Sequence, residues 1–471
     1  MAIAGVLLVA LGGGLLMQAT KSPHVGLPGT QTASASASPG KTTVVWFMGL
    51  GPGENAAELD FVSKYNATNS DNIHLELDIP PAAVTDSTID DLLAGTDILG
   101  PFSLQNYPAL SDRWLGLDEL IAKNHTDLSE YPPAFLATFQ DSTGQYLGLP
   151  YDEYPAFIYY NKDIFKAAGL PDLPTEVGQK YMGQDWTWDE LTTIARRLTV
   201  DTSGKKSTDP GFNPAKIQTF GFDAQWVSDL RRFATPWGAG SYVTADGKTA
   251  QIPAVWKQAS EWYYDAMWVS HFALTGPERT ALAGDGGKTV ATGRVAMDLA
   301  WTWGIDSFGP LDASGNPIPA STYKHWDMGV LPSNNGVTTN PIDTDAFVIN
   351  KKSKVPDAAY TVILKIMADP KLMAAYGAMP LAQSMQAAYF ETTQAFVDKQ
   401  FANNPLSWSA VTDMTKYATS PTGQDPMPNF DRGSRDDRAF YTKLQIEPRL
   451  NLAAEIAKFR AMLQADFDAP Q

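Results

Sequence analysis

A strand, a helix and a second strand follow one another at the start of the folded part of the chain. Residues 43–48 are β-branched and aromatic, which favours a strand, and residues 73–79 alternate apolar and polar positions as a half-buried strand does. Between them, residues 54–65 supply the apolar positions of a helix. A strand–helix–strand unit begins an α/β fold with parallel pairing, and we expect that fold class here.

The rest of the chain continues this alternation of strands and helices. Thr187 and Glu190 resemble a capping box, in which Thr187 bonds the amide three residues on and Glu190 reaches back. Asn161 and Asp163 are expected to shape a strand exit and to cap the helix that follows, and Gly169 to end that helix. The further strands are expected at 146–149, 157–160, 294–299 and 346–349, and the further helices at 115–123, 163–168, 187–198, 254–272 and 358–376.

The length and the charge of the chain limit both its organisation and its partners. At 471 residues the chain exceeds the size at which one hydrophobic core stops growing, so two or more lobes are expected. Its net charge of −17 argues against DNA, RNA or an anionic membrane as the main partner. A nucleic-acid binder neutralises phosphates with clustered Lys and Arg, and we therefore expect no nucleic-acid partner.

The chain lacks residues that many metal sites and covalent catalysts use. It contains no cysteine, which removes disulfides, thiolate metal sites and cysteine nucleophiles together. Its five histidines are scattered, with no pair spaced three or four residues apart, so no metal site is expected. No common hydrolase motif stands out, and we assign neither a catalytic residue nor a cofactor.

Residues 1–40 indicate export. Ile3–Met17 is almost purely apolar, and a stretch rich in Ser, Ala, Thr, Pro and Gly runs from there to Gly40. The apolar run resembles the central region of a secretory signal, although no basic region precedes it, and it is shorter than the roughly 20 residues that span a bilayer. Cleavage and retention as an N-terminal membrane anchor on a flexible tether both stay open. We expect an extracytoplasmic location, in the periplasm or on the outer face of the cytoplasmic membrane.

The aromatic content suggests one class of ligand. The chain has 13 Trp, 18 Tyr and 21 Phe, and most of these are expected in the core. Trp226, Trp237, Trp301 and Trp303, however, lie beside loops and strand ends. An exposed aromatic face can stack on the C–H face of a pyranose ring while acids and amides bind its hydroxyls. This composition is compatible with a sugar site but does not by itself require one.

Specific motifs occur in the middle of the chain. Tyr146-Leu-Gly-Leu-Pro150 is followed by Tyr159-Tyr-Asn-Lys-Asp-Ile-Phe-Lys-Ala-Ala-Gly-Leu170 and then by Trp186-Thr-Trp-Asp-Glu-Leu191. This order resembles the family 1 extracellular solute-binding proteins of ABC sugar importers, and the middle block is the most specific. Supporting blocks are Gly293-Arg-Val-Ala-Met297, Trp326-Asp-Met-Gly-Val-Leu-Pro332 and Phe347-Val-Ile-Asn-Lys-Lys352.

The resemblance implies a maltose-binding-protein-like fold with two lobes. In this periplasmic-binding-protein fold, each lobe has a mixed, mostly parallel sheet flanked by helices, and hinge crossovers join the lobes. After the signal or anchor segment 1–40, an N-lobe would comprise 41–152 and 341–379, and a C-lobe 153–340 and 380–471. A ligand would be trapped between the lobes when they close.

The resemblance also implies which residues contact the ligand. Trp303 matches the position at which the family commonly stacks a sugar ring, and Trp301 stands where a glycine is usual, so that it would narrow the cleft or add a second aromatic platform. Asp152, Glu153 and Tyr154 lie in the loop near the hinge and are expected to contact the ligand. The remaining candidates are Asp343 and Asp345, which would accept sugar hydroxyls or else only cap a turn, and Trp226 and Trp237, which would line the C-lobe wall.

The function that the resemblance implies is transport. A monomer would bind a mono- or oligosaccharide reversibly, without chemistry, and deliver it to the permease subunits of an ABC importer. A non-sugar ligand such as a polyamine, iron or a peptide is one alternative. A carbohydrate-active enzyme with paired carboxylates is a second, and an adhesin or sensor partner is a third.

Overall fold

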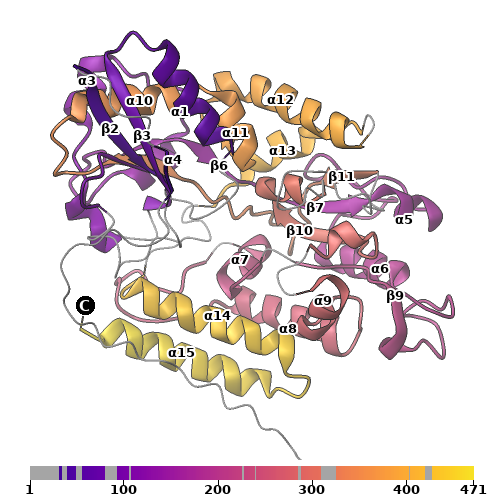
Figure 1. The fold of residues 1–471 in the computed structure, drawn as a ribbon. Coiled ribbons are helices and arrows are strands. Elements are labelled where there is room, and N and C mark those ends of the chain that lie inside the picture. Colours follow the sequence, from indigo (N-terminus) through magenta and orange to yellow (C-terminus); the bar gives the residue numbers. More distant parts are fainter. Residues whose placement is uncertain are drawn as a thin grey trace, which may run out of the picture.

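The computed structural model arranges the chain in two lobes, each built around its own β-sheet (Figure 1). Within the described residues, every helix is too short or too polar to cross a membrane. The residues described are 31–33, 40–48, 56–79, 93–104, 108–224, 227–238, 240–284, 288–308, 325–401, 404–419 and 427–470.

The N-lobe contains a six-stranded sheet in the order β1-β3-β2-β4-β12-β5. β2 pairs in parallel with β3 and β4, and the other three pairings are antiparallel. Alternate residues of β2 and β3, such as Trp46 and Leu75, are fully buried. The strands are β1 (Gln31–Ala33), β2 (Thr42–Phe47), β3 (Ile73–Ile79), β4 (Ile98–Phe102), β5 (Gly148–Pro150) and β12 (Ala346–Ile349), and the helices are α1 (Ala56–Thr68), α3 (Asp118–Asn124), α4 (Pro133–Leu136), α10 (Pro356–Met367) and α11 (Pro370–Tyr376).

The C-lobe contains a three-stranded sheet in the order β10-β7-β11, and every residue of β7 is buried. The long helices α14 and α15 pack against each other along the lower edge of this lobe (Figure 1). The strands are β7 (Ala156–Asn161), β10 (Met297–Trp301) and β11 (Trp326–Gly329), with a small hairpin of β8 (Val200–Asp201) and β9 (Ile217–Thr219). The helices are α5 (Lys162–Ala167), α6 (Trp188–Leu198), α7 (Leu230–Ala234), α8 (Ala254–Trp268), α9 (Gly276–Ala283), α13 (Trp408–Met414), α14 (Phe430–Ile446) and α15 (Leu452–Asp468).

Several elements lie between the sheets or connect the longer elements. α12 packs against α11 and against β13, which pairs with β6 at the junction of the lobes. The elements concerned are α12 (Gln383–Phe401), β6 (Asp152–Glu153) and β13 (Met379–Pro380). Short 3-10 helices are η2 (Pro108–Arg113), η3 (Ala137–Phe139), η4 (Pro214–Lys216), η5 (Thr235–Trp237), η6 (Val290–Thr292), η7 (Thr302–Phe308) and η8 (Thr415–Tyr417).

The local signals in the sequence correspond to observed helix ends. Asn161 accepts hydrogen bonds from two amides at the start of α5, and Gly169 after that helix has a φ of +66°. Thr187 accepts from the amide of Glu190 at 3.2 Å and so caps α6. The expected helix at 358–376 is instead two helices, because Asp369 caps α11 and the following proline disfavours a helical residue before it.

The α/β fold class is confirmed, but the pairing within the sheets differs from the expectation. Parallel pairing among the named strands is limited to β3-β2-β4, and the strands of the C-lobe sheet are antiparallel. The reason is connectivity. β12 enters the N-lobe sheet from the other lobe, so it runs opposite to β4 and pairs with it in an antiparallel register.

Three segments form the hinge, of which two connect the two sheets and the third leads from α11 to α12. Residues 151–155 lead from β5 to β7, residues 330–345 lead from β11 to β12, and residues 377–382 follow α11. Backbone hydrogen bonds join them: the amide of Tyr154 donates to Asp343 at 2.8 Å, and β6 pairs with β13. The lobe boundaries given above are not tested by this arrangement and stay a prediction.

Candidate functional site

An aromatic platform lies where the C-lobe sheet meets the hinge. Trp303, in η7 directly after β10, is only partly buried. Its indole stacks on that of Trp301, with ring centroids 5.0 Å apart and planes 7° apart, and it meets the Tyr154 ring edge-on at 5.1 Å. Gly377 permits this packing, because a Cβ at that position would lie 2.7 Å from the Trp303 Cα. Trp303 is therefore a fixed aromatic ring with part of its surface exposed.

Trp301 supports this platform from inside the lobe. It is fully buried, and its indole N–H donates to the carbonyl of Pro341 at 2.6 Å. The hydroxyl of Tyr159 in turn donates to the Trp301 carbonyl at 2.8 Å. In this structure Trp301 thus offers no second platform, and its position behind Trp303 indicates that it orients that ring.

Arg232 completes the site and was missed by the sequence reasoning. Its guanidinium lies 6.0 Å from the centre of the Trp303 ring and donates to Asp343 Oδ2 at 2.9 Å. Burial lowers the pKa of Arg232, but attraction to Asp343 and Asp229 outweighs it and the net shift is upward. Asp229 also caps α7 by accepting from the Arg232 amide. This Asp-to-Arg spacing is an ordinary helix cap, so the sequence held no signal for a site.

The hinge segments carry four buried carboxyl groups, those of Asp152, Glu153, Asp343 and Asp345, and Arg232 binds one of them, Asp343. Burial raises the pKa of Asp345 to about 7, and it also raises the pKa values of Asp152 and Asp343. The Asp345 amide donates to Asp152 Oδ1 at 2.9 Å. Asp152 Oδ2 and Asp343 Oδ1 have no hydrogen-bond partner among the described residues. Buried acceptors of this kind are normally satisfied, so these two oxygens keep hydrogen-bonding capacity inside the hinge, and Asp152 also lies beside the Tyr154 hydroxyl.

The remaining predicted residues lie elsewhere. Glu153 is next to Asp152 in β6 but accepts a hydrogen bond from Gln386 of α12 at 3.1 Å, and burial raises its pKa to about 8. Trp237 is buried in the C-lobe, where it stacks on Trp188 with centroids 4.6 Å apart. Trp226 lies outside the described residues. The structure therefore brings together Trp303, Tyr154, Asp343, Asp345 and Asp152, with Arg232 added and Trp301 behind.

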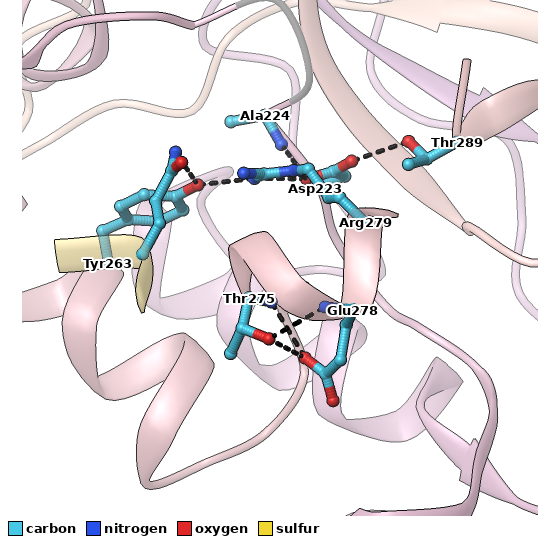
Figure 2. Close-up of polar contacts among 8 residues, drawn as sticks. Asp223, Ala224, Tyr263, Thr275, Glu278, Arg279 and Thr289 are labelled. Atoms are coloured by element: carbon cyan, nitrogen blue, oxygen red, sulfur yellow. Dashed lines mark hydrogen bonds and ion pairs between the residues drawn. The ribbon is translucent and has the colours of Figure 1, made fainter. Parts of the chain in front are cut away.

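A second charged cluster inside the C-lobe is built differently (Figure 2). Asp223 accepts from Arg279 Nε at 2.7 Å, from the Thr289 hydroxyl at 2.7 Å and from the Ala224 amide at 2.8 Å. Arg279 also donates to the Tyr263 hydroxyl at 2.6 Å. Both oxygens of Asp223 thus have protein partners, and the single negative charge faces a single positive one. This cluster holds α9 to the lobe and leaves no capacity for a ligand.

No metal centre can be assigned from these residues. Among the described residues, no group of three His, Asp or Glu side chains is arranged to hold a metal ion. Instead, the Asp343 carboxylate is bonded to Arg232 and the Asp152 carboxylate to the Asp345 amide, while the Thr344 hydroxyl donates to the backbone carbonyl of Asp152 at 2.5 Å. The site therefore offers one aromatic face, one guanidinium and free carboxylate oxygens, which suit a neutral or cationic ligand rich in donors.

Two lobes, each with its own sheet, and a polar and aromatic site at their hinge define a periplasmic-binding-protein fold. The family model for bacterial extracellular solute-binding proteins matches residues 112–371, which is more than half of the chain. The chain therefore belongs to the bacterial extracellular solute-binding proteins, and the resemblance identified in the sequence is confirmed. A search of curated protein sequences gives no match.

Solved structures show the same fold at low sequence identity. An ABC substrate-binding protein from Listeria monocytogenes, in complex with cycloalternan, has a TM-score of 0.66 and 16% identity over 90% of this chain and 98% of its own. The sugar-binding protein MalE from Xanthomonas citri has a TM-score of 0.62 and 15% identity, covering 90% and 97%. A cyclic α-maltosyl-1,6-maltose binding protein from Arthrobacter globiformis has a TM-score of 0.60 and 17% identity, covering 91% and 99%.

Proposed function

We propose that this protein captures a carbohydrate between its lobes and delivers it to the permease of an ABC importer. The observation that carries the proposal is the partly exposed Trp303, held by Trp301 and Tyr154 beside Arg232 and Asp343. An indole face stacks on the C–H face of a pyranose, and its hydroxyls then meet the carboxylate and guanidinium groups at the edge. This is the combination of groups that a saccharide requires.

The similar proteins support a carbohydrate as the ligand class. One of them is in complex with cycloalternan, and another is a cyclic maltosyl-maltose binding protein. The fold provides the mechanism: the three hinge segments let one lobe move against the other, so that the ligand is enclosed and the closed form docks on the permease. The proposed role involves no bond breaking, and a panel of chromogenic glycosides incubated with the protein should therefore remain intact.

The location that we propose follows the family and the N-terminal sequence. The family is extracellular, and Ile3–Met17 has the composition of a secretory signal core. We propose export to the outer side of the cytoplasmic membrane, with the segment either removed or retained as an anchor. Mass spectrometry of the secreted and membrane fractions distinguishes the two, because cleavage lowers the intact mass by the mass of the removed segment.

A saccharide screen tests the proposed ligand. Binding to the native state raises the melting temperature by mass action, so we expect a stabilising shift with at least one mono- or oligosaccharide. Trp303→Ala should then weaken the affinity for that sugar by about 30-fold, which corresponds to the roughly 2 kcal/mol of a buried aromatic contact. Trp268→Phe, on a half-buried tryptophan of α8 away from the hinge, is the control and should leave the affinity unchanged.

One observation favours a second ligand class. Asp152 and Asp345 are buried acids near the hinge without an ion pair among the described residues, and a cationic polyamine would favour their charged forms. The same thermal screen decides between the two, because spermidine and putrescine are included beside the sugars. A shift with a polyamine and none with any carbohydrate overturns the carbohydrate proposal.

A further inference from the structure

A cavity of about 930 Å³ lies at the outer end of the N-lobe sheet, away from the hinge. β12 connects the two places: it leaves the hinge after Asp345 and reaches the cavity at Asn350. The volume is within the range of small-molecule sites. The cavity is lined by the start of β2, by residues 93–97 before β4, by the end of η2 and by residues 350–355 before α10.

The charge of this cavity is opposite to that of the protein. Its lining includes Arg113, Lys351, Lys352 and Lys354, in a chain whose net charge is −17. The three lysines are exposed, and none of them forms an ion pair with a described residue. Exposed lysines without an ion pair also occur elsewhere on the protein, but these three line a cavity, and their joint positive charge would attract an anion into it.

The two acidic residues of the lining are already engaged. Asp97 accepts from the Ser353 hydroxyl at 2.6 Å and from the Val45 amide at 3.0 Å. Asp112 is paired with Arg113. Asp112 offsets the charge of Arg113, and Asp97 keeps its own charge because its donors are neutral. The four cationic side chains of the lining still outnumber its two carboxylates.

The loop that carries the lysines is held in place. The side chain of Asn350, which is buried, donates to the carbonyls of Leu93 and Thr96 at 2.8 Å and accepts from the Lys352 amide at 2.9 Å. The Lys351 amide donates to the Arg113 carbonyl at 2.9 Å. A fixed backbone beneath flexible cationic side chains lowers the ordering cost of binding, as in other preorganised sites.

From this arrangement we infer that the cavity is a second ligand site, separate from the hinge site, that binds a phosphate-bearing anion. The lysine ammonium groups bind phosphate oxygens as point charges. The phosphate groups belong either to a soluble polyphosphorylated molecule or to the headgroups of anionic phospholipid. The inference goes beyond the proposed function and does not depend on it.

The soluble arm of the test uses the full chain and inositol hexakisphosphate, with inorganic phosphate alongside. Calorimetric titration at low salt should show binding that weakens as salt is raised, because screening acts on exposed charges. The triple variant Lys351→Gln, Lys352→Gln, Lys354→Gln should bind at least tenfold more weakly. The matched control Lys205→Gln, Lys206→Gln, Lys216→Gln removes the same charge from exposed positions in the C-lobe and should bind as the wild type does.

The lipid arm compares vesicles of phosphatidylcholine alone with vesicles that also contain about 30 mol% phosphatidylglycerol, an anionic lipid that attracts basic patches. We expect the increase in sedimented protein caused by the anionic lipid to be lost in the cavity variant and kept in the control variant. Comparing the two vesicle types removes any contribution of the apolar N-terminal segment, which is the same in both.

The outcomes are distinguishable. Binding in the soluble arm without binding to anionic vesicles identifies a soluble ligand. Binding to anionic vesicles without binding in the soluble arm identifies the membrane surface. The absence of both, or an equal loss in the cavity and control variants, overturns the inference. All variants should keep the melting temperature of the wild type and its response to the hinge-site ligand, so failure of this site is separable from failure of the proposed function.

Discussion

Two arginine–aspartate clusters of this protein, one in the C-lobe and one at the hinge, have similar components but different completeness. In the C-lobe, Arg279 and Asp223 balance each other, and every oxygen of the carboxylate has a protein partner. At the hinge, Arg232 faces Asp343 with two further buried carboxyl groups nearby, and oxygens of Asp343 and Asp152 lack partners within the described residues. A buried polar cluster that is complete stabilises one lobe, whereas an incomplete one beside an exposed ring is suited to a ligand.

The largest effect is expected from breaking the complete cluster. Arg279→Met leaves the carboxylate of Asp223 buried without its cation, which should lower the free energy of unfolding by about 3–5 kcal/mol. Urea unfolding of the variant measures this, and ligand affinity of the remaining folded protein should equal that of the wild type. If the folded variant binds the ligand more weakly than the wild type does, this cluster also contributes to ligand binding.

The incomplete cluster should respond in the opposite way. Asp343→Asn keeps the shape of the side chain but removes the charge that orients Arg232 beside Trp303. We expect the affinity for the ligand to fall about tenfold, as for one hydrogen bond to a charged group. The loss of stability should stay near 1 kcal/mol, because the Arg232 side chain is 28% exposed and solvent screens its charge. Calorimetry and urea unfolding of the same preparation separate the two quantities.

The hinge carboxyl groups should also make stability depend on pH. Burial raises the pKa of Asp345 to about 7 in the folded state, whereas an unfolded aspartic acid has a pKa of roughly 3.9. Between these values the folded state holds a proton that the unfolded state has released, so stability falls as the pH rises from about 4 to 7. In Asp345→Asn this fall should be smaller, by up to roughly 3 kcal/mol across the window. The free energy of unfolding is measured at several pH values for the wild type and the variant. An equal fall with pH in both proteins would contradict this prediction.

The smallest effect is expected at Glu153, which is adjacent to the hinge cluster in sequence but not part of it. Because burial raises its pKa to about 8, its side chain is mainly neutral at pH 7, and Gln can replace it while still accepting from Gln386. Glu153→Gln should therefore change affinity by less than about twofold and should not destabilise the protein at pH 7, because the amide needs no proton to stay neutral. A loss of binding would place Glu153 in the site.

Much of the fold could be predicted from the sequence because its signals are local. The alternation of Ile73–Ile79 and the apolar run Ala346–Ile349 predicted β3 and β12 with their observed bounds. Asn161 and Thr187 cap helices as their positions indicated. Strand direction was harder to predict, because it depends on which lobe a strand enters from, and that is a property of connections rather than of residue pattern.

The candidate site shows the same division between local signals and tertiary structure. Trp303 and the aspartates of the hinge were predicted through a family resemblance, and the structure groups them near one another. Burial of Trp301 and Trp237 could not be read from their neighbours in sequence, because an aromatic residue at a strand end can face either solvent or core. Arg232 was missed for a related reason, since its role arises from Asp343, which is 111 positions away.

By itself, the sequence determined the class of fold, the family and the supply of aromatic and acidic groups, because these follow from periodicity, caps and motifs within short segments. Only the tertiary structure decided which of those groups meet. The hinge brings Tyr154, Arg232, Trp303 and Asp343 together from separate segments, and it leaves the carboxylates incompletely bonded. Contacts between distant residues depend on how the lobes pack, and packing is set by the whole chain rather than by any one segment of it.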